Sequence, residues 1–303
     1  GTPGVREHCL FMDTRAQAER FRERFMNTCL QANYRNDPVS VAIVGGGATG
    51  VELAAEIHHA VAMLKLYGHE HLDRKQLNVT LVEALPRILP ALSERVSAAA
   101  QTRLEALGVT VRTGVMVAEA NENALITKDG DTLDSDLMVW AAGVKAPEFL
   151  GQLEGFQVNK INQIEVEPTL QAKGDDRVFV IGDCAFFKPE GAEKPIPPRA
   201  QSAQQMAHHT AKNLQRLLMN RDAKPFEYRD HGSLVSLSNY SSVGMLMGNL
   251  KGGNFFVEGW LARIMYVGLY RMHQAALYGW PRTLMLLAAG RFSKLVRPRL
   301  KLH

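Results

Sequence analysis

The chain has 303 residues, of which 46% are hydrophobic and 22% charged, so it has the composition of a folded globular protein and is long enough for two domains. Its cysteines, Cys9, Cys29 and Cys184, form no CxxC pair, which excludes a disulfide framework and a zinc-ligand spacing and fits a reducing compartment. The net charge is +4, but residues 259–303 contain eight Lys and Arg and no acidic residue, so the rest is mildly acidic.

The first half of the chain has the alternating pattern of a parallel sheet. Residues 13–33 carry apolar residues at the spacing of an amphipathic helix, which leads into a loop at Asn36-Asp37-Pro38. The elements expected after this loop alternate between apolar strands and longer helices: strand 39–44, helix 51–66, strand 78–83, helix 93–107 and strand 109–112. This alternation predicts an α/β fold with a parallel sheet.

A different pattern interrupts the alternation at residues 115–136. Short apolar stretches flank a turn at Asp129-Gly130, which predicts a meander of antiparallel strands. The run Val139–Ala142 then has the apolar residues of a buried strand, and the domain is expected to close near Val144.

A dinucleotide-binding fingerprint lies between the first of these strands and its helix. Gly45, Gly47 and Gly50 form G-x-G-x-x-G, in which the first glycine permits a tight turn, the second lets the backbone approach a pyrophosphate and the third allows close packing of helix and strand. The helix amino terminus then faces the phosphates. A glycine-rich turn without a ligand is the simpler alternative, but the strand and helix context favours a nucleotide.

The end of the next predicted strand favours NADH over NADPH. Glu83 would accept hydrogen bonds from the adenosine ribose and repel a 2′-phosphate. A surface glutamate at a strand end is the simpler alternative, and nearby Arg87 leaves the choice of cofactor open at this point.

A second cluster of motifs lies in residues 169–205, where TLQAKGDDRVFVIGDCA is followed by PPRAQSAQQ. Val178–Ile181 predicts a buried strand that ends at Gly182-Asp183, the position where α/β sheets bind ligands, although Gly-Asp is also ordinary turn chemistry. Gln201 and Gln205 are four residues apart in the helix expected after Pro198, so their side chains share one face.

Together these motifs resemble the type II (non-proton-pumping) NADH:quinone oxidoreductases, bacterial flavoproteins with two Rossmann-like dinucleotide-binding domains. The matching segments are GGGATGVELAAEI, WAAG, GDCA and AQSAQQ. The resemblance implies an enzyme that transfers a hydride from NADH to FAD and passes electrons to ubiquinone or menaquinone, at the entry to a respiratory chain. It also implies a peripheral or monotopic protein on the cytoplasmic face of the cell membrane.

The resemblance assigns roles around the flavin and the quinone. Asp183, with Gly182, would hold the ribitol of FAD. The backbone at Ala200 and Gln201 would lie against the isoalloxazine, and Gln201 and Gln205 would line the quinone tunnel.

The resemblance also assigns roles around the nicotinamide. Glu52, expected on the first turn of its helix, would lie near the nicotinamide and flavin rings and relay protons or position NADH, although the helix dipole alone explains an acidic residue there. Ala142 and Gly143 match the end of the NADH domain, as would any strand end made of small residues.

The basic tail is predicted to lie on an anionic membrane surface. In Gly259–Tyr278 one helix face is apolar and the other carries Arg263, Arg271 and Gln274, while the apolar run Thr283–Gly290 is far shorter than the roughly 20 residues that a membrane span needs. The apolar residues of that face are Leu261, Met265, Leu269, Met272 and Ala276. A helix pair that forms a homodimer remains open; nucleic acid is disfavoured, because phosphate binding needs no apolar face.

Four regions are expected. They are a connector helix and loop at 1–38, an NADH-binding domain at 39–145, the second part of the FAD domain with the quinone-site helix at 146–215, and a C-terminal domain at 216–303 with a membrane tail from about 259. The family's first G-x-G-x-x-G domain, which binds the ADP part of FAD, is not among these residues, so a poorly active fragment is expected.

Other functions remain open or lack their motifs. A soluble FAD-dependent NAD(P)H reductase of another acceptor and a non-catalytic NADH-binding membrane module are the alternatives. The sequence has no G-x-S-x-G and no P-loop, which argues against hydrolase and phosphoryl-transfer chemistry. The pairs His58-His59 and His208-His209 do not predict a metal site, since adjacent helical residues do not face each other.

Overall fold

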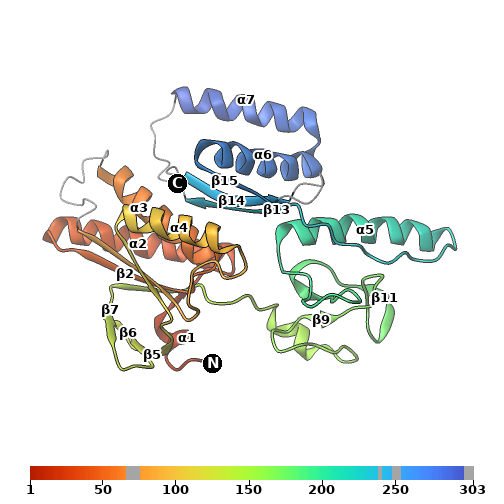
Figure 1. Ribbon diagram of the computed structural model, residues 1–303, viewed down its shortest axis with the longest axis horizontal. Helices are drawn as coiled ribbons and strands as arrows, with labels where there is room; N and C mark the ends of the chain where they lie inside the picture. The colour runs from red at the N-terminus through yellow and green to blue at the C-terminus, as the bar shows by residue number, and fades with distance from the viewer. Residues whose placement is uncertain (66–75, 238–240, 248–253, 297–303) are drawn as a thin grey trace. The chain divides into compact units, whose positions relative to one another are not determined.

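The computed structural model describes residues 1–65, 76–237, 241–247 and 254–296 (Figure 1). The chain divides into two compact units, one formed by Gly1–Ala142 with Gly232–His303 and the other by Gly143–His231. Each unit has its own hydrophobic core.

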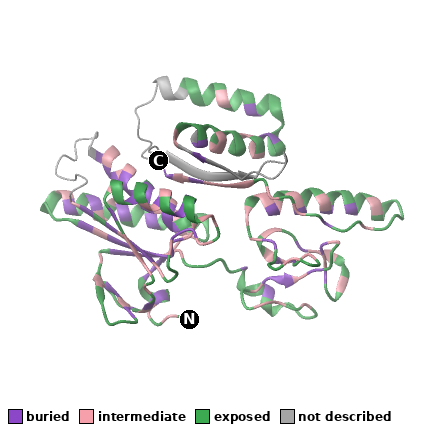
Figure 2. Cartoon of the chain, in the orientation of Figure 1, coloured by how far each residue is buried: buried purple, intermediate pink, exposed green. Residues whose placement is uncertain are grey.

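A parallel five-stranded sheet forms the centre of the first unit. Its strands, in spatial order, are β1 (Leu10–Phe11), β8 (Leu137–Trp140), β2 (Val39–Val44), β3 (Leu77–Glu83) and β4 (Val109–Thr113), and all neighbours are parallel. These strands are rich in valine and leucine because helices or other strands cover both faces, and most of their residues are buried (Figure 2). The parallel α/β sheet predicted from the sequence is confirmed.

Three helices accompany this sheet, and local capping sets their ends. They are α2 (Arg15–Arg35), α3 (Ala48–Lys65) and α4 (Glu94–Leu107), with a short α1 (Val5–His8) before them. Thr14 and Gln17 form a capping box at the start of α2, and the Ser93 hydroxyl caps α4. Helix α3 begins at Ala48, inside the glycine motif and three residues before its predicted start.

The predicted meander is present as β5 (Val117–Ala120), β6 (Ala124–Thr127) and β7 (Thr132–Asp134), which pair antiparallel in chain order. Its buried residues Val117, Ala120 and Leu125 form a separate small core with Val44 and Met138 of the parallel sheet.

A second antiparallel sheet lies on the helices of the first unit. It consists of β13 (Gly232–Leu237), β14 (Ser241–Met247) and β15 (Asn254–Glu258). Val235 and Leu237 of β13 are buried in the core that α3 and α4 share with the parallel sheet. Helix α6 (Gly259–Tyr278) packs on this sheet and α7 (Trp280–Val296) packs on α6 (Figure 1).

The second unit is built from short elements and one long helix. Its elements are η1 (Glu148–Gln152), β9 (Ile164–Glu165), β10 (Gln171–Ala172), β11 (Asp175–Phe179), η2 (Gly182–Cys184), β12 (Ala185–Phe186) and α5 (Ala200–Leu218). The strand predicted at 178–181 is wrong in extent: β11 ends at Phe179 and pairs antiparallel with β10. Val178 and Phe179 are partly buried, Val180 is buried and Ile181 is exposed. A short apolar run does not reveal an antiparallel partner that lies only a few residues earlier in the chain.

We expect Phe25→Ala to destabilise the first unit by about 3–5 kcal/mol, because it deletes a core ring. Phe25 is only 3% exposed and its ring stacks on Phe21 with centroids 5.8 Å apart. Tyr34→Ala on the same helix is the control, since Tyr34 is 92% exposed and its loss should change stability by less than about 0.5 kcal/mol. Urea unfolding followed by circular dichroism measures both, and equal effects would contradict this account of the α2 core.

Candidate functional site

The glycine motif forms a turn that no larger residues could form. Gly45 has φ +111°, and a Cβ there would lie 2.7 Å from the backbone of Ala141 and Ala142. A Cβ on Gly50 would lie 2.0 Å from the Gly45 carbonyl oxygen. Around Gly47, in contrast, no atom lies within 4 Å of a built Cβ. The first and third glycines are therefore required by packing, and the second leaves an open approach for a ligand.

The Glu83 carboxylate is hydrogen-bonded to this turn. Its Oε2 accepts from the backbone N–H of Gly46 at 2.7 Å, and its Oε1 accepts from the N–H of Leu85 at 2.8 Å. The sequence placed Glu83 at the end of its strand but gave no sign of the bond to Gly46. This bond brings the carboxylate, the open side of Gly47 and the start of α3 into one site at the carboxyl end of the parallel sheet.

The Arg87 side chain is hydrogen-bonded to backbone carbonyl groups. Its guanidinium donates to the carbonyls of Leu89, Pro90 and Leu92 at 3.3, 2.9 and 2.8 Å. These bonds hold the loop before α4 in place, so the arginine that left the cofactor choice open in the sequence serves a structural role.

The small residues after β8 complete the turn. Ala141 donates from its N–H to the Val44 carbonyl at 2.8 Å, which continues the parallel ladder by one residue and places Ala142 against Gly45. Gly143 has φ +88° and is the first residue of the second unit.

Glu52 contacts the second sheet. It is the fifth residue of α3, so it lies beyond the first turn where it was expected, and the helix dipole alone explains it less well. Its Oε1 accepts from the Ser236 N–H of β13 at 2.9 Å. Burial raises the pKa of Glu52 above its ordinary value, and the hydrogen bond from Ser236 opposes this shift. Burial and the Glu52 charge also raise the pKa of Tyr266 in α6.

In the second unit, Gly182 and Asp183 lie against the beginning of α5. Gly182 has φ +66°, a Cβ there would lie 3.2 Å from the Ala203 side chain, and its N–H donates to the Met206 sulfur at 3.3 Å. The Asp183 side chain is exposed, and its backbone carbonyl accepts from Gln163 Nε2 at 3.0 Å. A buried Gln163 therefore orients the turn, a role that the sequence did not reveal.

The two glutamines of α5 contact the segment that follows the helix. Gln205 accepts from the Arg229 N–H at 3.0 Å and donates to the Arg229 carbonyl at 2.8 Å. Gln201 accepts from the His231 N–H at 2.9 Å. The structure thus brings Gln201, Gln205 and the exposed Ala200 to one end of α5, beside Gly182 and Asp183.

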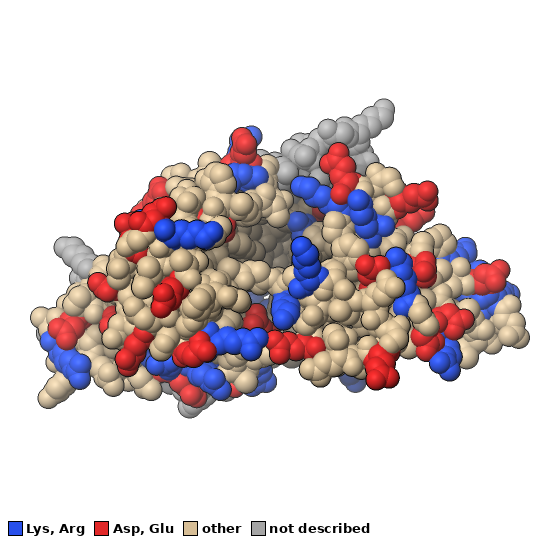
Figure 3. All heavy atoms as spheres, turned by 90° about the horizontal axis from the view of Figure 1, so that it is seen from below, with Lys and Arg blue, Asp and Glu red and all other residues tan. Residues whose placement is uncertain are grey.

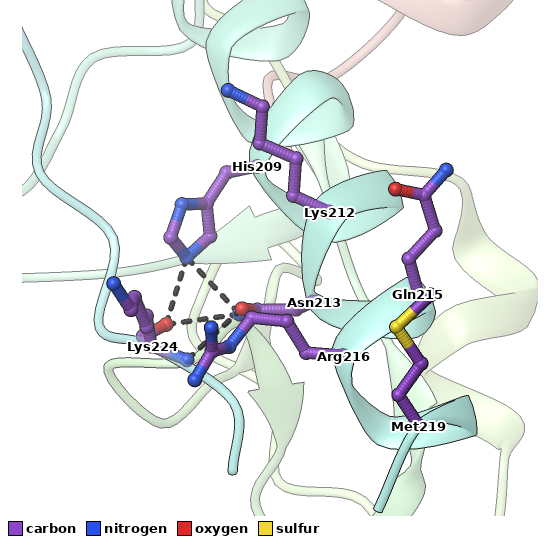
Figure 4. A pocket seen from close by; sticks show the side chains of 7 residues that line it. All are labelled: His209, Lys212, Asn213, Gln215, Arg216, Met219 and Lys224. Atoms are coloured by element: carbon purple, nitrogen blue, oxygen red, sulfur yellow. Dashed lines mark hydrogen bonds between the residues drawn. The ribbon is translucent and has the colours of Figure 1, made fainter. Parts of the chain in front are cut away.

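A cavity of about 320 Å³ lies at the other end of α5 (Figure 4). Three cationic side chains, Lys212, Arg216 and Lys224, are in its wall, and no acidic residue lines it. Asn213 hydrogen-bonds both the N–H and the carbonyl of Lys224 at 2.9 Å. None of the residues predicted for the site lies here.

The predicted residues therefore form two groups. Gly45, Gly47, Gly50, Glu83 and Ala142 meet at one edge of the parallel sheet, with Glu52 further along α3. The residues Gly182, Asp183, Ala200, Gln201 and Gln205 meet in the second unit. Among the described residues, no three His, Cys, Asp or Glu side chains are grouped as metal ligands.

Comparison with known proteins agrees with this architecture. A family model for "Pyridine nucleotide-disulphide oxidoreductase" matches residues 1–207, which defines the class. A Haemophilus influenzae protein described as "Type II NADH:quinone oxidoreductase" is 43% identical over 100% of this chain and 72% of its own length. A Staphylococcus aureus protein of the same description is 32% identical over 82% of this chain and 62% of its own length. The chain belongs to the type II NADH:quinone oxidoreductase family.

The fold has a counterpart among solved structures. The structure of NDH2 from Plasmodium falciparum in complex with NADH has a TM-score of 0.80 at 18% identity, over 99% of this chain and 76% of that one. At this identity the likeness shows the fold. The family and fold class predicted from the sequence are confirmed.

The pKa of Glu52 leads to a pH-dependent stability. Because burial raises it, the folded chain holds a proton that the unfolded chain releases, and stability is lost as pH rises from the unfolded pKa through the folded one. Glu52→Gln keeps an acceptor for Ser236 and removes the charge. We expect the variant to be more stable than the wild type near neutral pH, with the difference vanishing well below pH 4.

Urea unfolding between pH 3.5 and 8 measures this difference. Glu56→Gln is the matched control, since Glu56 is one turn further along α3 and exposed. A Glu52→Gln effect that stays constant over this range, or that Glu56→Gln reproduces, would contradict a buried and protonatable Glu52.

Proposed function

We propose that this chain takes part in the oxidation of NADH and the reduction of a membrane quinone through FAD. The observation that supports the proposal is the hydrogen bond from Gly46 to Glu83 beside the open side of Gly47, because this arrangement suits a nucleotide site in the first unit. The chain spans 72% and 62% of the length of the two relatives, so the activity of the whole protein is part of the proposal.

NADH is proposed to bind at this turn. Its pyrophosphate is proposed to lie at the start of α3, where backbone N–H groups point out of the helix, and the open space around Gly47 supports this placement. Glu83, fixed by two backbone donors, is proposed to accept from the ribose hydroxyls. Ala142 and Gly143 are proposed to let the cofactor pass close to the backbone.

The flavin site is proposed in the second unit. The turn at Gly182 leaves the exposed Asp183 carboxylate as an acceptor for the ribitol hydroxyls, and Ala200 begins a helix whose N–H groups are available to a ring edge. FAD supplies the hydride-accepting chemistry, while the protein supplies binding, orientation and electrostatics. Glu52, which is half-buried and has a raised pKa, is proposed to position NADH or relay a proton, and Gln201 and Gln205 are proposed to serve the quinone.

Attachment to an anionic membrane surface is proposed for α6 and α7. Helix α6 buries Ala262 and Ala275, while many large apolar side chains of both helices are exposed (Figure 2). These include Trp260, Leu261, Ile264, Leu269, Met272, Trp280, Leu284, Met285 and Phe292. No helix in the described part of the chain is long and apolar enough to cross a bilayer. Exposed apolar side chains beside basic ones match an interfacial helix.

The excess of basic residues is found in the tail, and other surfaces carry charges of both signs. On the face shown in Figure 3, acidic and basic side chains are interspersed. The eight Lys and Arg of residues 259–303 have no acidic neighbour in the sequence, and each cation near an anionic surface contributes about 1 kcal/mol.

We expect Glu83→Ser to reduce the preference for NADH over NADPH by about tenfold. The variant removes the repulsion of the 2′-phosphate, which at 4 Å is about 1–4 kcal/mol between water and a protein surface. It also removes the acceptor of Gly46, so NADH should bind more weakly. Quenching of nicotinamide fluorescence gives both dissociation constants, and kcat/KM of the FAD-loaded holoenzyme tests the same ratio in turnover.

The control is Glu122→Ser, in the exposed turn between β5 and β6. An unchanged NADH to NADPH ratio in Glu83→Ser, or a wild type that binds the two equally, would refute the assignment of Glu83.

We expect the double variant Leu284→Gln/Met285→Gln to bind anionic vesicles at least about tenfold more weakly, because burying each such side chain contributes about 1.5–3 kcal/mol. The matched control is Leu218→Gln/Met219→Gln, an exposed Leu-Met pair at the end of α5. Co-sedimentation with neutral and anionic vesicles at low and high salt separates the apolar from the electrostatic part. Unchanged binding together with a dimer that dissociates in the α7 variant would show that this surface joins two copies instead.

A further inference from the structure

The segment after α5 lies in no helix or strand, yet its backbone is hydrogen-bonded. Residues 221–231 connect α5 to β13 and run back alongside the helix (Figure 1). Backbone N–H and C=O groups need partners wherever water is excluded. Here side chains of α5 supply them, and these side chains are spaced along one stripe of the helix.

The amino-terminal half of the stripe consists of the two glutamines. Gln201 binds the N–H of His231, and Gln205 binds both the N–H and the carbonyl of Arg229. Four helical residues advance about 6.0 Å and two extended residues about 6.4–6.8 Å. The spacing of the glutamines therefore matches alternate residues of an antiparallel extended segment.

The carboxyl-terminal half continues the polar stripe, although the pairing of four helical residues with two segment residues is not kept there. His209 and Asn213, each four residues further on, contact the carbonyl of Lys224 at 2.8 and 2.9 Å, and Asn213 also accepts from its N–H (Figure 4). Arg216 donates to the Asp222 carbonyl at 2.7 Å. Polar side chains of α5 thus bind the segment from one end to the other. The two glutamines are the first members of this longer row of structural contacts.

Holding this segment places three further polar groups at the start of α5. Gln201 Nε2 lies 3.4 Å from both the Tyr228 hydroxyl and the Asp230 carboxylate. Arg199, the residue before the helix, pairs with Asp230 at 3.6 Å. Tyr228 also packs against the core of the second unit, which fixes its ring.

We propose that Gln201 and Gln205 are positioning residues, which hold residues 228–231 against α5 and thereby place Tyr228, Asp230 and Arg199 around the quinone. This inference rests on the proposed function, because it assumes that the quinone is reduced at the start of α5. The alternative is that the glutamines bind the quinone directly. In that case the conformation of the backbone at Arg229 and His231 would not depend on the glutamines.

Hydrogen exchange of the holoenzyme tests the structural half of the proposal. Gln205→Met keeps the length of the side chain and removes both hydrogen bonds to Arg229, so exchange at the Arg229 N–H should become about tenfold faster. Gln205→Glu keeps an acceptor for the Arg229 N–H and should give a smaller increase. Gln204→Met is the matched control, since Gln204 is the exposed neighbour on the same helix, and it should leave exchange unchanged.

Kinetics with the same variants tests the functional half. We expect Gln205→Met to raise the quinone KM about tenfold with a smaller change in kcat and no change in NADH-dependent flavin reduction, and we expect Gln205→Glu to recover part of the loss. Slower quinone reduction without faster exchange would overturn the proposal in favour of direct contact. Faster exchange with an unchanged quinone KM would also overturn it, since the stripe would then serve stability alone.

The proposed function and the positioning role of the glutamines are refuted by different results. A wild-type holoenzyme that oxidises NADH but does not reduce quinone would overturn the proposed function before any variant is compared. The exchange measurements would still show whether Gln205 holds Arg229, because they need no substrate.

Discussion

The close approach of α3 to the turn at Gly45 is the constraint on which the first unit depends. The third glycine of the motif stands where any Cβ would collide with the Gly45 carbonyl, so only glycine lets the helix start so near the end of β2. That position directs the amino terminus of α3 at the open side of Gly47. It also brings Gly46 within reach of Glu83, so one steric requirement sets both the start of α3 and the position of the Glu83 carboxylate.

The same helix is covered on its other side by the antiparallel sheet. Because β13 contributes Val235 and Leu237 to the core of α3 and α4, a glutamate on α3 that would otherwise face water is half-buried at Ser236. Its raised pKa is a consequence of this packing and not of a neighbouring charge. The antiparallel sheet therefore does more than cover apolar surface, since it also raises the pKa of a carboxyl group on α3.

The sequence predicted best those elements whose pattern is local. The strand at Val39–Val44 and the helix at Gly259–Tyr278 have the predicted bounds, because an apolar run between turn residues and a 3.6-residue period are visible without knowledge of contacts. It predicted least well what depends on distant partners. The acceptors of Arg87, the bond between Ser236 and Glu52 and the partners of the glutamines all join residues whose proximity only the fold creates.

The glutamines illustrate how one pattern can be read in two ways. Spacing of four residues places Gln201 and Gln205 on one face, which is equally suited to a bound ring and to an extended backbone. A carboxamide has two donor hydrogens and two acceptor lone pairs, and Gln205 uses one of each on Arg229. Both the oxygen and the nitrogen of this amide therefore point at the backbone of Arg229, which sets the orientation of the side chain. Glutamines held in this way fix the backbone of Arg229 and His231 in advance, which reduces the entropy that ordering this segment would cost when a ligand binds.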